Sequence, residues 1–268
     1  MTASERLNKR IDELQVFAKK ALGQNFLISD GVINQIIKAV ALEKPQKLIE
    51  IGPGCGALTD LLLEMKVEDL TLIELDRQLA EFWRTQGQNV IEVDALRMDW
   101  NFSPDHMLVS NLPYQISSSL VIDRSLDVKP LKAMVLMFQK EVAQRIRAQA
   151  QTEHYGMLSV IAQEFWTIET VCDAGPRDFK PAPKVSSRVL KFKPRDSSVQ
   201  NREQYLSFVK SCFKQRRRVL TTNLNALSAD YDRKRLPHWF IQHKKSDKAR
   251  AEELSPTEIN SLYHALKV

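Results

Sequence analysis

Short apolar runs alternate with longer mixed segments through the first half of the chain. The runs are Lys47–Ile51, Leu70–Leu75, Val90–Val93, Met107–Val109 and Ala133–Phe138. Short, nearly continuous apolar runs are typical of strands buried on both faces, and helix-length spacers between most of them favour parallel pairing. The pattern therefore predicts an α/β fold in which helices cover a parallel sheet.

Helical signals fill the segments around these runs. A capping box formed by Thr2 and Glu5 opens one helix, and the apolar positions of 32–40 form one face of another. We expect three of the crossover helices at Ala57–Met65, Gln78–Thr85 and Lys140–Ala150.

The pattern changes twice after the fifth run. Phe165–Ala174 and Ser187–Phe192 are expected as further strands, joined by the proline-rich loop Gly175–Val185, which would give the sheet an antiparallel finish. Past Pro194 the apolar spacing is helical. We therefore predict two domains, residues 1–195 with the sheet and an N-terminal helical extension, and residues 196–268 as a small all-helical domain.

Charge is distributed unevenly along the 268 residues. The chain has a net charge of +6, and the segment from Arg195 to Arg250 alone has 14 basic and 5 acidic residues. A basic helical lobe on a mildly acidic remainder indicates contacts with the phosphates of a nucleic acid. The alternative is a solvated helical surface without a partner.

Nothing in the sequence indicates disulfides, a metal site or a membrane anchor. Cys55, Cys172 and Cys212 are far apart, and the five histidines lack ligand spacing. No apolar run approaches the length of a membrane span, and the N-terminus lacks the core of a signal peptide. We expect a cytoplasmic protein that has no membrane partner and needs no metal.

The first candidate for chemistry is the glycine-rich stretch Ile51–Ala57, which lies between a predicted strand and a predicted helix. Glycines there allow a sharp turn and close approach of the backbone to a ligand. Gly52, Gly54 and Ala57 also fit the dinucleotide pattern, and Glu74 has the spacing of a ribose-binding carboxylate. The motif indicates a nucleoside cofactor without identifying it, and a purely structural turn is the alternative.

Two more polar residues follow neighbouring runs. Asp94 comes directly after the third run, where its carboxylate could bind an adenine amino group, and Asn111 follows the fourth. Ligands of open parallel sheets bind beyond the carboxyl ends of the strands. Gly52, Glu74, Asp94 and Asn111 are therefore expected to converge on one crevice.

The stretch Asn111-Leu112-Pro113-Tyr114 combines a side-chain amide, a rigid turn and an aromatic ring. The exocyclic amine of a nucleobase is a poor nucleophile, because its lone pair is delocalised into the ring. The Asn111 side-chain oxygen and the carbonyl of Leu112 or Pro113 could each accept one of its N–H groups. Tyr114 could stack on the base, which is worth about 1–3 kcal/mol. An ordinary proline turn with a buried tyrosine is the alternative.

From about Lys19 onward the chain resembles the KsgA family of small-subunit ribosomal RNA adenine N6-dimethyltransferases. The resemblance depends on the joint order of several short segments: Lys20–Leu27, Glu50–Thr59, Asn111–Ser117, Gln139–Ala143, Tyr155–Val160, Phe179–Val185, and Gln215–Arg218 with Asn223–Leu224. It implies a Rossmann-like class I methyltransferase fold. Val93 stands where the family often has glycine, and the segment Ser228–Lys248 could not be aligned.

The resemblance also implies the reaction, with S-adenosylmethionine as donor and two adjacent adenosines near the 3′ end of small-subunit rRNA as acceptors. The partner would be this RNA or an assembling small subunit, and we expect a monomer. By position, Asn25 and Leu27 would contact the donor, Gly52 and Gly54 its amino-acid part, Glu74 the ribose and Asp94 the adenine. Phe179 would press on the other face of the flipped adenine, or pack as a loop plug.

Three other functions fit parts of the pattern. A related resistance methyltransferase acts on large-subunit rRNA with the same chemistry. A binding module, such as a transcription-factor-like relative or an assembly factor, could keep the fold without needing methyl transfer. A DNA adenine methyltransferase is also compatible with a basic helical lobe. The Asn111–Tyr114 stretch and the segment Ala251–Pro256 favour the small-subunit enzyme.

Overall fold

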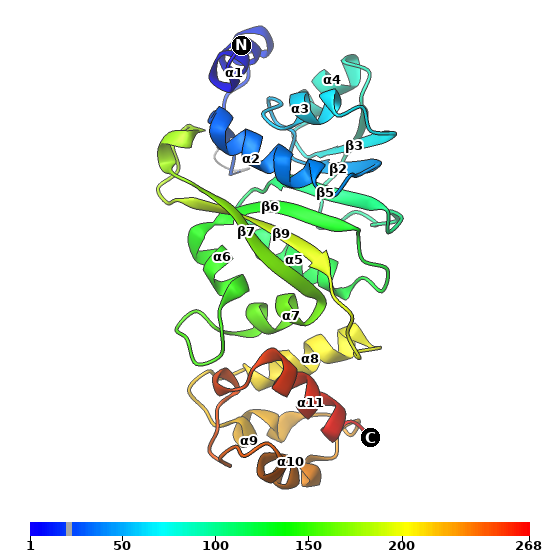
Figure 1. Cartoon of the computed structure of the whole chain (residues 1–268), viewed down its shortest axis with the longest axis vertical. Helices are drawn as coiled ribbons and strands as arrows, with labels where there is room; N and C mark the ends of the chain where they lie inside the picture. Colours follow the sequence, from blue (N-terminus) through cyan, green and yellow to red (C-terminus); the bar gives the residue numbers. More distant parts are fainter. Residues whose placement is uncertain (20–22) are drawn as a thin grey trace. The chain divides into compact units, whose positions relative to one another are not determined.

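The computed structural model describes residues 1–19 and 23–268, which form two compact units (Figure 1). The first contains Met1–Asp123, Lys129–Ala143 and Ile168–Pro194, and the second contains Arg124–Val128, Gln144–Thr167 and Arg195–Val268. The second unit therefore includes two segments that precede residue 195 in the sequence. Lys20, Ala21 and Leu22, which open the first family-like segment, lie outside the described residues.

A seven-stranded sheet in the order β4-β3-β2-β5-β6-β9-β7 forms the framework of the first unit. The five strands from β4 to β6 are parallel to their neighbours, and β9 is antiparallel to β6. The predicted parallel sheet with an antiparallel finish is confirmed. The strands are β2 (Lys47–Ile51), β3 (Asp69–Glu74), β4 (Asn89–Glu92), β5 (His106–Asn111), β6 (Ala133–Gln139), β7 (Trp166–Ala174) and β9 (Ser187–Pro194).

The strand order reverses at β2, which lies between β3 and β5. Chain connections leave opposite sides of the sheet at such a point, and they open a crevice at the carboxyl ends of the strands. Register places Glu50 of β2 beside Val109 of β5, and Ile51 beside Ile73 of β3. The residues that follow β2, β3 and β5 are therefore brought to one edge of the sheet.

Helices of the first unit bury one hydrophobic cluster against this sheet. Side chains of α2 (Asp30–Ala41), α3 (Thr59–Glu64) and α4 (Arg77–Thr85) join side chains of β2, β3, β5, β6 and β9 in it. Helix α1 (Ala3–Leu14) has the predicted capping box, because the Thr2 hydroxyl accepts from the Glu5 N–H and the Glu5 carboxylate accepts from the Thr2 N–H. Helices α5 (Ser117–Leu126) and α6 (Lys140–Arg147) start in this unit.

A second, two-stranded sheet was not expected from the sequence. In it β1 (Phe26–Leu27) pairs antiparallel with β8 (Phe179–Lys180), so that Leu27 lies opposite Phe179. The Ile28 N–H extends the ladder by donating to the Asp178 carbonyl at 2.8 Å. Strands this short have no periodicity to detect, and their pairing joins segments about 150 residues apart.

The second unit is helical. Its helices are α7 (Met157–Phe165), α8 (Arg202–Cys212), α9 (Leu220–Asn223), α10 (Leu236–Gln242) and α11 (Pro256–Leu266). Tyr205, Phe208 and Tyr263 pack ring against ring in its core. The helix expected over 219–227 is split into α9 and a 3-10 turn at Leu224–Ala226. No helix within the described residues combines the length and apolarity needed to cross a bilayer.

Candidate functional site

The glycine-rich turn follows β2 and leads into α3. Gly52 and Gly54 both have left-handed backbone angles, with φ of +67° and +52°, a region that residues with a Cβ rarely occupy. At Gly54 a Cβ would also lie 3.2 Å from the ring of Phe26. Glycine is therefore required at Gly54 by both its backbone angle and the close approach of β1.

Glu74 ends β3 beside this turn and is only 6% exposed. Its two carboxylate oxygens accept from the backbone N–H groups of Gly54, at 3.2 Å, and Asp76, at 2.9 Å. Burial raises the pKa of this carboxyl, although the backbone N–H groups that it accepts from act in the opposite direction. Each oxygen retains lone-pair capacity for a further donor, such as a sugar hydroxyl.

Asp94 lies past β4 and is oriented by its own turn. One carboxylate oxygen accepts from the Leu96 N–H at 2.9 Å, and the other lies 3.6 Å from Nε of Arg97. Leu75, directly after Glu74, is 53% exposed although it is a large apolar residue. It lines the same cavity as Asp94, and sequence reasoning missed it because Leu75 closes an apolar run, which predicts a buried strand end.

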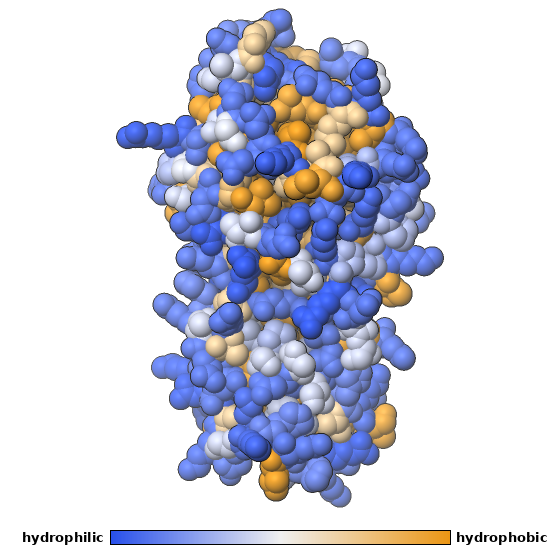
Figure 2. Space-filling view, in the orientation of Figure 1, coloured by the Kyte–Doolittle hydropathy of each residue, from blue (hydrophilic) through white to orange (hydrophobic). Residues whose placement is uncertain are grey.

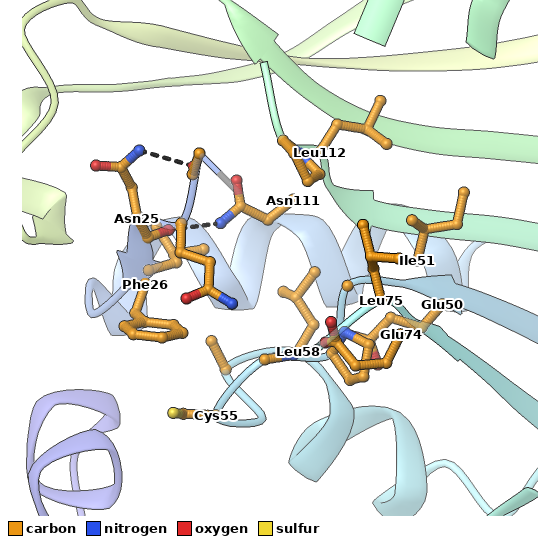
Figure 3. A pocket seen from close by; sticks show the side chains of 18 of the residues that line it. Asn25, Phe26, Glu50, Ile51, Cys55, Leu58, Glu74, Leu75, Asn111 and Leu112 are labelled. Carbon is orange, nitrogen blue, oxygen red and sulfur yellow. Dashed lines mark hydrogen bonds between the residues drawn. The ribbon is translucent and has the colours of Figure 1, made fainter. Parts of the chain in front are cut away.

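Asn111 is the last residue of β5, and its amide is turned toward β1. Its Nδ2 donates to the backbone carbonyl of Asn25 at 3.2 Å (Figure 3). The Asn25 side chain donates in turn to the Gly23 carbonyl at 3.1 Å. This bond fixes the orientation of the amide, whose side-chain oxygen is the atom that can accept a hydrogen bond from a ligand.

The turn after Asn111 orients an aromatic ring. The Pro113 carbonyl accepts from the Ile116 N–H at 3.2 Å, whereas no described residue donates to the Leu112 carbonyl. The Tyr114 hydroxyl lies 2.9 Å from the hydroxyl of Ser187 on β9. Burial raises the pKa of Tyr114, so its phenol is neutral at pH 7. Of the two carbonyls that the sequence proposed as the second acceptor, that of Leu112 is the less engaged.

One cavity of about 270 Å³ brings most of the predicted residues together. Every residue proposed from the sequence lines it except Phe179: Asn25, Leu27, Gly52, Gly54, Glu74, Asp94, Asn111, Leu112, Pro113 and Tyr114. Phe179 is 3% exposed and packs in the hydrophobic cluster with Leu27. In this conformation it occupies the position expected of a loop plug, and its stacking role stays a prediction.

The cavity has further walls that sequence reasoning did not find. Ala3, Arg6 and Leu7 of α1 line it, as does Glu50 of β2. Glu50 is 2% exposed, and burial raises its pKa to about 8. The capping box and apolar spacing of α1 predicted a helix but carried no sign of what it covers. Among the described residues, no group of three His, Cys, Asp or Glu side chains could hold a metal ion.

Comparison with known proteins agrees with this geometry. A family model described as "Ribosomal RNA adenine dimethylase" matches residues 16–267. The Ribosomal RNA small subunit methyltransferase A of Bdellovibrio bacteriovorus is 53% identical over 264 residues, which cover 97% of this chain and 96% of that protein. The chain belongs to the ribosomal RNA adenine dimethylase family.

Solved structures place this dimethylase among methyltransferases of the same fold. A dimethyladenosine transferase from Plasmodium falciparum superposes with a TM-score of 0.74 at 25% identity, over 88% of this chain and 95% of that one. The 23S rRNA methyltransferase ErmE superposes with a TM-score of 0.68 at 26% identity, over 90% and 99%. The Rossmann-like methyltransferase fold expected from the sequence is thus confirmed.

Proposed function

We propose that this dimethylase transfers methyl groups from S-adenosylmethionine to N6 of two adjacent adenosines near the 3′ end of small-subunit (16S) rRNA. Each adenosine would be dimethylated during maturation of the small subunit. Support comes from family membership and from the relative whose name specifies the small ribosomal subunit. One structural observation carries the chemistry: the Asn111–Tyr114 turn and the glycine turn line the same cavity.

The residues of the cavity suit such a donor. S-adenosylmethionine, when bound, supplies a methyl group on a sulfonium that has a strong tendency to give it up. The Glu74 carboxylate retains acceptor capacity for ribose hydroxyls, and Asp94 can accept from an adenine amino group. Leu75, the residue after Glu74, has an exposed apolar side chain that lines the same cavity. This side chain can cover a face of the purine.

Asn111 and its neighbours prepare the amine that is to be methylated. The Asn111 side-chain oxygen and the Leu112 carbonyl would each accept one N–H of the adenine amino group, which localises the nitrogen lone pair. Both acceptors also stabilise the positive charge that builds on this nitrogen. Tyr114, oriented by the hydroxyl of Ser187, offers a flat face on which the base stacks. These residues contribute alignment as well as charge stabilisation.

We further propose that residues 1–195 act as the catalytic domain and residues 196–268 as an RNA-binding domain. The basic excess of 195–250 is suited to phosphate contacts. The substrate would be small-subunit rRNA or the assembling 30S particle, met by a monomer in the cytoplasm. Phe179 would be the second residue that stacks on the adenine. Because its side chain is buried, the β8 region would have to open when the base enters.

The experiment is a methyl-transfer assay with labelled S-adenosylmethionine on three substrates: unmethylated small subunits, large subunits and duplex DNA. We expect label in small-subunit rRNA, at two adjacent adenosines. Label confined to large subunits would favour the activity named for ErmE, the 23S rRNA methyltransferase. Label confined to DNA would refute the proposal.

Asn111→Ala tests the role of the amide directly. It removes one acceptor of the amine, and we expect the rate of methyl transfer to fall by about 10²–10³-fold, the loss typical of one transition-state hydrogen bond. Asn8→Ala is the matched control, since Asn8 is an α1 amide that accepts from Lys180 and does not line the cavity. A full rate in Asn111→Ala would contradict the proposed mechanism.

A further inference from the structure

Arg6 is the only basic residue among the described residues that line the donor cavity. The acidic residues that line it are Glu50, Glu74 and Asp94. A cavity with several carboxyl groups and one guanidinium suits a ligand that carries net positive charge and a single carboxylate. The amino-acid end of S-adenosylmethionine has an ammonium and a carboxylate, and of these two groups only the carboxylate is stabilised by a cationic side chain.

The Arg6 guanidinium is incompletely paired. Its Nη1 donates to the Met1 carbonyl at 2.9 Å, and its Nε lies 3.2 Å from Oδ2 of Asp60. Its Nη2 is buried and has no hydrogen-bond partner among the described residues. A buried charged donor without an acceptor is unfavourable, and a carboxylate is the acceptor that a guanidinium binds best.

A neighbouring arginine makes more contacts than Arg6 between α1 and the rest of the first unit. Arg10 donates to both oxygens of Asp60, at 3.0 and 2.6 Å, and to the Cys55 carbonyl at 2.6 Å. Its guanidinium also packs over the rings of Phe82 and Trp83. Arg10 therefore makes the closer contacts with Asp60, which Arg6 shares through Nε, and Nη2 of Arg6 has donor capacity left for a ligand.

We propose that Arg6 binds the carboxylate of the donor's amino-acid end. The inference rests on the proposed function, because it takes S-adenosylmethionine as the occupant of the cavity. Helix α1 precedes residue 16, where the match to the family model begins. The contact would therefore be made by a segment of this chain that the family model does not cover.

The test compares two ligands that differ only in the carboxylate: S-adenosylhomocysteine and its decarboxylated counterpart, measured by titration calorimetry. Arg6→Ala should weaken binding of S-adenosylhomocysteine by about 10- to 100-fold, the range for a lost charge-assisted hydrogen bond. The decarboxylated ligand should bind Arg6→Ala and the wild type equally well. Lys9→Ala is the control on the same helix, where Lys9 is exposed and pairs with Glu13, and it should change neither affinity.

A second variant separates ligand binding from attachment of the helix. Asp60→Ala removes the carboxylate that Arg6 and Arg10 share but leaves both guanidinium groups, so the ratio of the two affinities should stay close to that of the wild type. Equal losses of both ligands in Arg6→Ala, or no loss, would overturn the assignment while leaving the proposed function in place. Failure of the wild type to bind either ligand would overturn both.

Discussion

Glu50 is the least solvated carboxyl group that lines the cavity among the described residues. It comes one residue before the end of β2, and its Oε2 has no hydrogen-bond partner among them. Burial is the main cause that raises its pKa to about 8, and the nearby charges of Asp60 and Glu74 act in the same direction. The group is therefore mostly protonated at pH 7, and it places little additional charge beside Glu74.

The raised pKa of Glu50 makes the free energy of unfolding depend on pH. The ordinary pKa of the group is 4.5, and its folded value is about 8. Between these values the unfolded chain has released the proton and the folded chain retains it. The free energy of unfolding therefore falls as pH rises, by up to about 1.4 kcal/mol per unit from this group, and the loss is complete above pH 8.

Glu50→Gln removes the titration while keeping the size of the side chain. We expect the variant to gain stability relative to the wild type progressively from pH 5 to pH 8, as measured by urea unfolding at each pH. Glu13→Gln is the control, since its side chain is 53% exposed, and its difference from the wild type should not follow this course. Parallel pH curves for Glu50→Gln and wild type would contradict the assigned protonation.

At the scale of elements, the β1–β8 ladder positions one wall of the site. Residues of β1 pair with β8, and Asn25, immediately before β1, accepts from the Asn111 amide. The orientation of the amide thus depends on a ladder formed by two distant segments. Phe179 of β8 anchors this ladder in the hydrophobic cluster, which gives it a structural role whatever it does for the RNA.

Truncation of Phe179 should therefore be costly. Phe179→Ala should lower the free energy of unfolding by about 3–5 kcal/mol, as for other buried phenylalanines. Phe179→Leu, which keeps an apolar side chain, should cost less than about 1.5 kcal/mol. Thermal or chemical unfolding measures both, and a small loss in Phe179→Ala would mean that the side chain is not part of the core.

The leucine variant also tests the proposed stacking on adenine. Leucine fills the core but has no ring to place against a base. We expect Phe179→Leu to lower the rate of RNA methylation while donor affinity remains unchanged. An unaltered rate would leave Phe179 with packing alone.

At the scale of the whole molecule, RNA binding depends on which basic side chains are exposed and available to contact phosphates. The face of the second unit shown in Figure 2 is mostly hydrophilic. The three arginines of Arg216–Arg218 in this unit differ from one another in their partners. Arg216 pairs with Glu252 at 2.7 Å and donates to the Glu153 carbonyl at 2.5 Å. Arg217 and Arg218 are exposed, so they are the better candidates for phosphate contacts.

Replacing Arg217 and Arg218 by Ala should reduce the salt dependence of RNA binding. Each lost phosphate contact lowers the slope of log affinity against log salt by about 0.7–0.9, and filter binding at several salt concentrations measures it. Arg216→Ala is the comparison, for which we expect a loss of stability with a nearly unchanged slope. An unchanged slope in the double variant would mean that these two arginines do not contact the RNA.

Much of this architecture could be predicted because its signals are local. The strands β2, β3 and β6 are short, mostly apolar and largely buried runs, and the glycine turn follows one of them. Helix α5, by contrast, was missed because its serine-rich start lacks a clear apolar period. Helix α10 lies within Ser228–Lys248, which could not be matched to the family. Its Trp239 and Phe240 side chains are buried only when the chain is folded.

The sequence by itself determined the α/β alternation, the glycine turn and the place of the Asn111–Tyr114 stretch at the end of a strand, since each depends on neighbouring residues and on the rule that parallel strands end at one edge. Tertiary structure alone decided which further groups join them and how each is oriented. Asn111 faces the carbonyl of Asn25 just before β1, Phe179 lies in the core, and Arg6 of α1 lines the cavity. These contacts join segments far apart in the chain, and burial and packing set them only when the chain is folded.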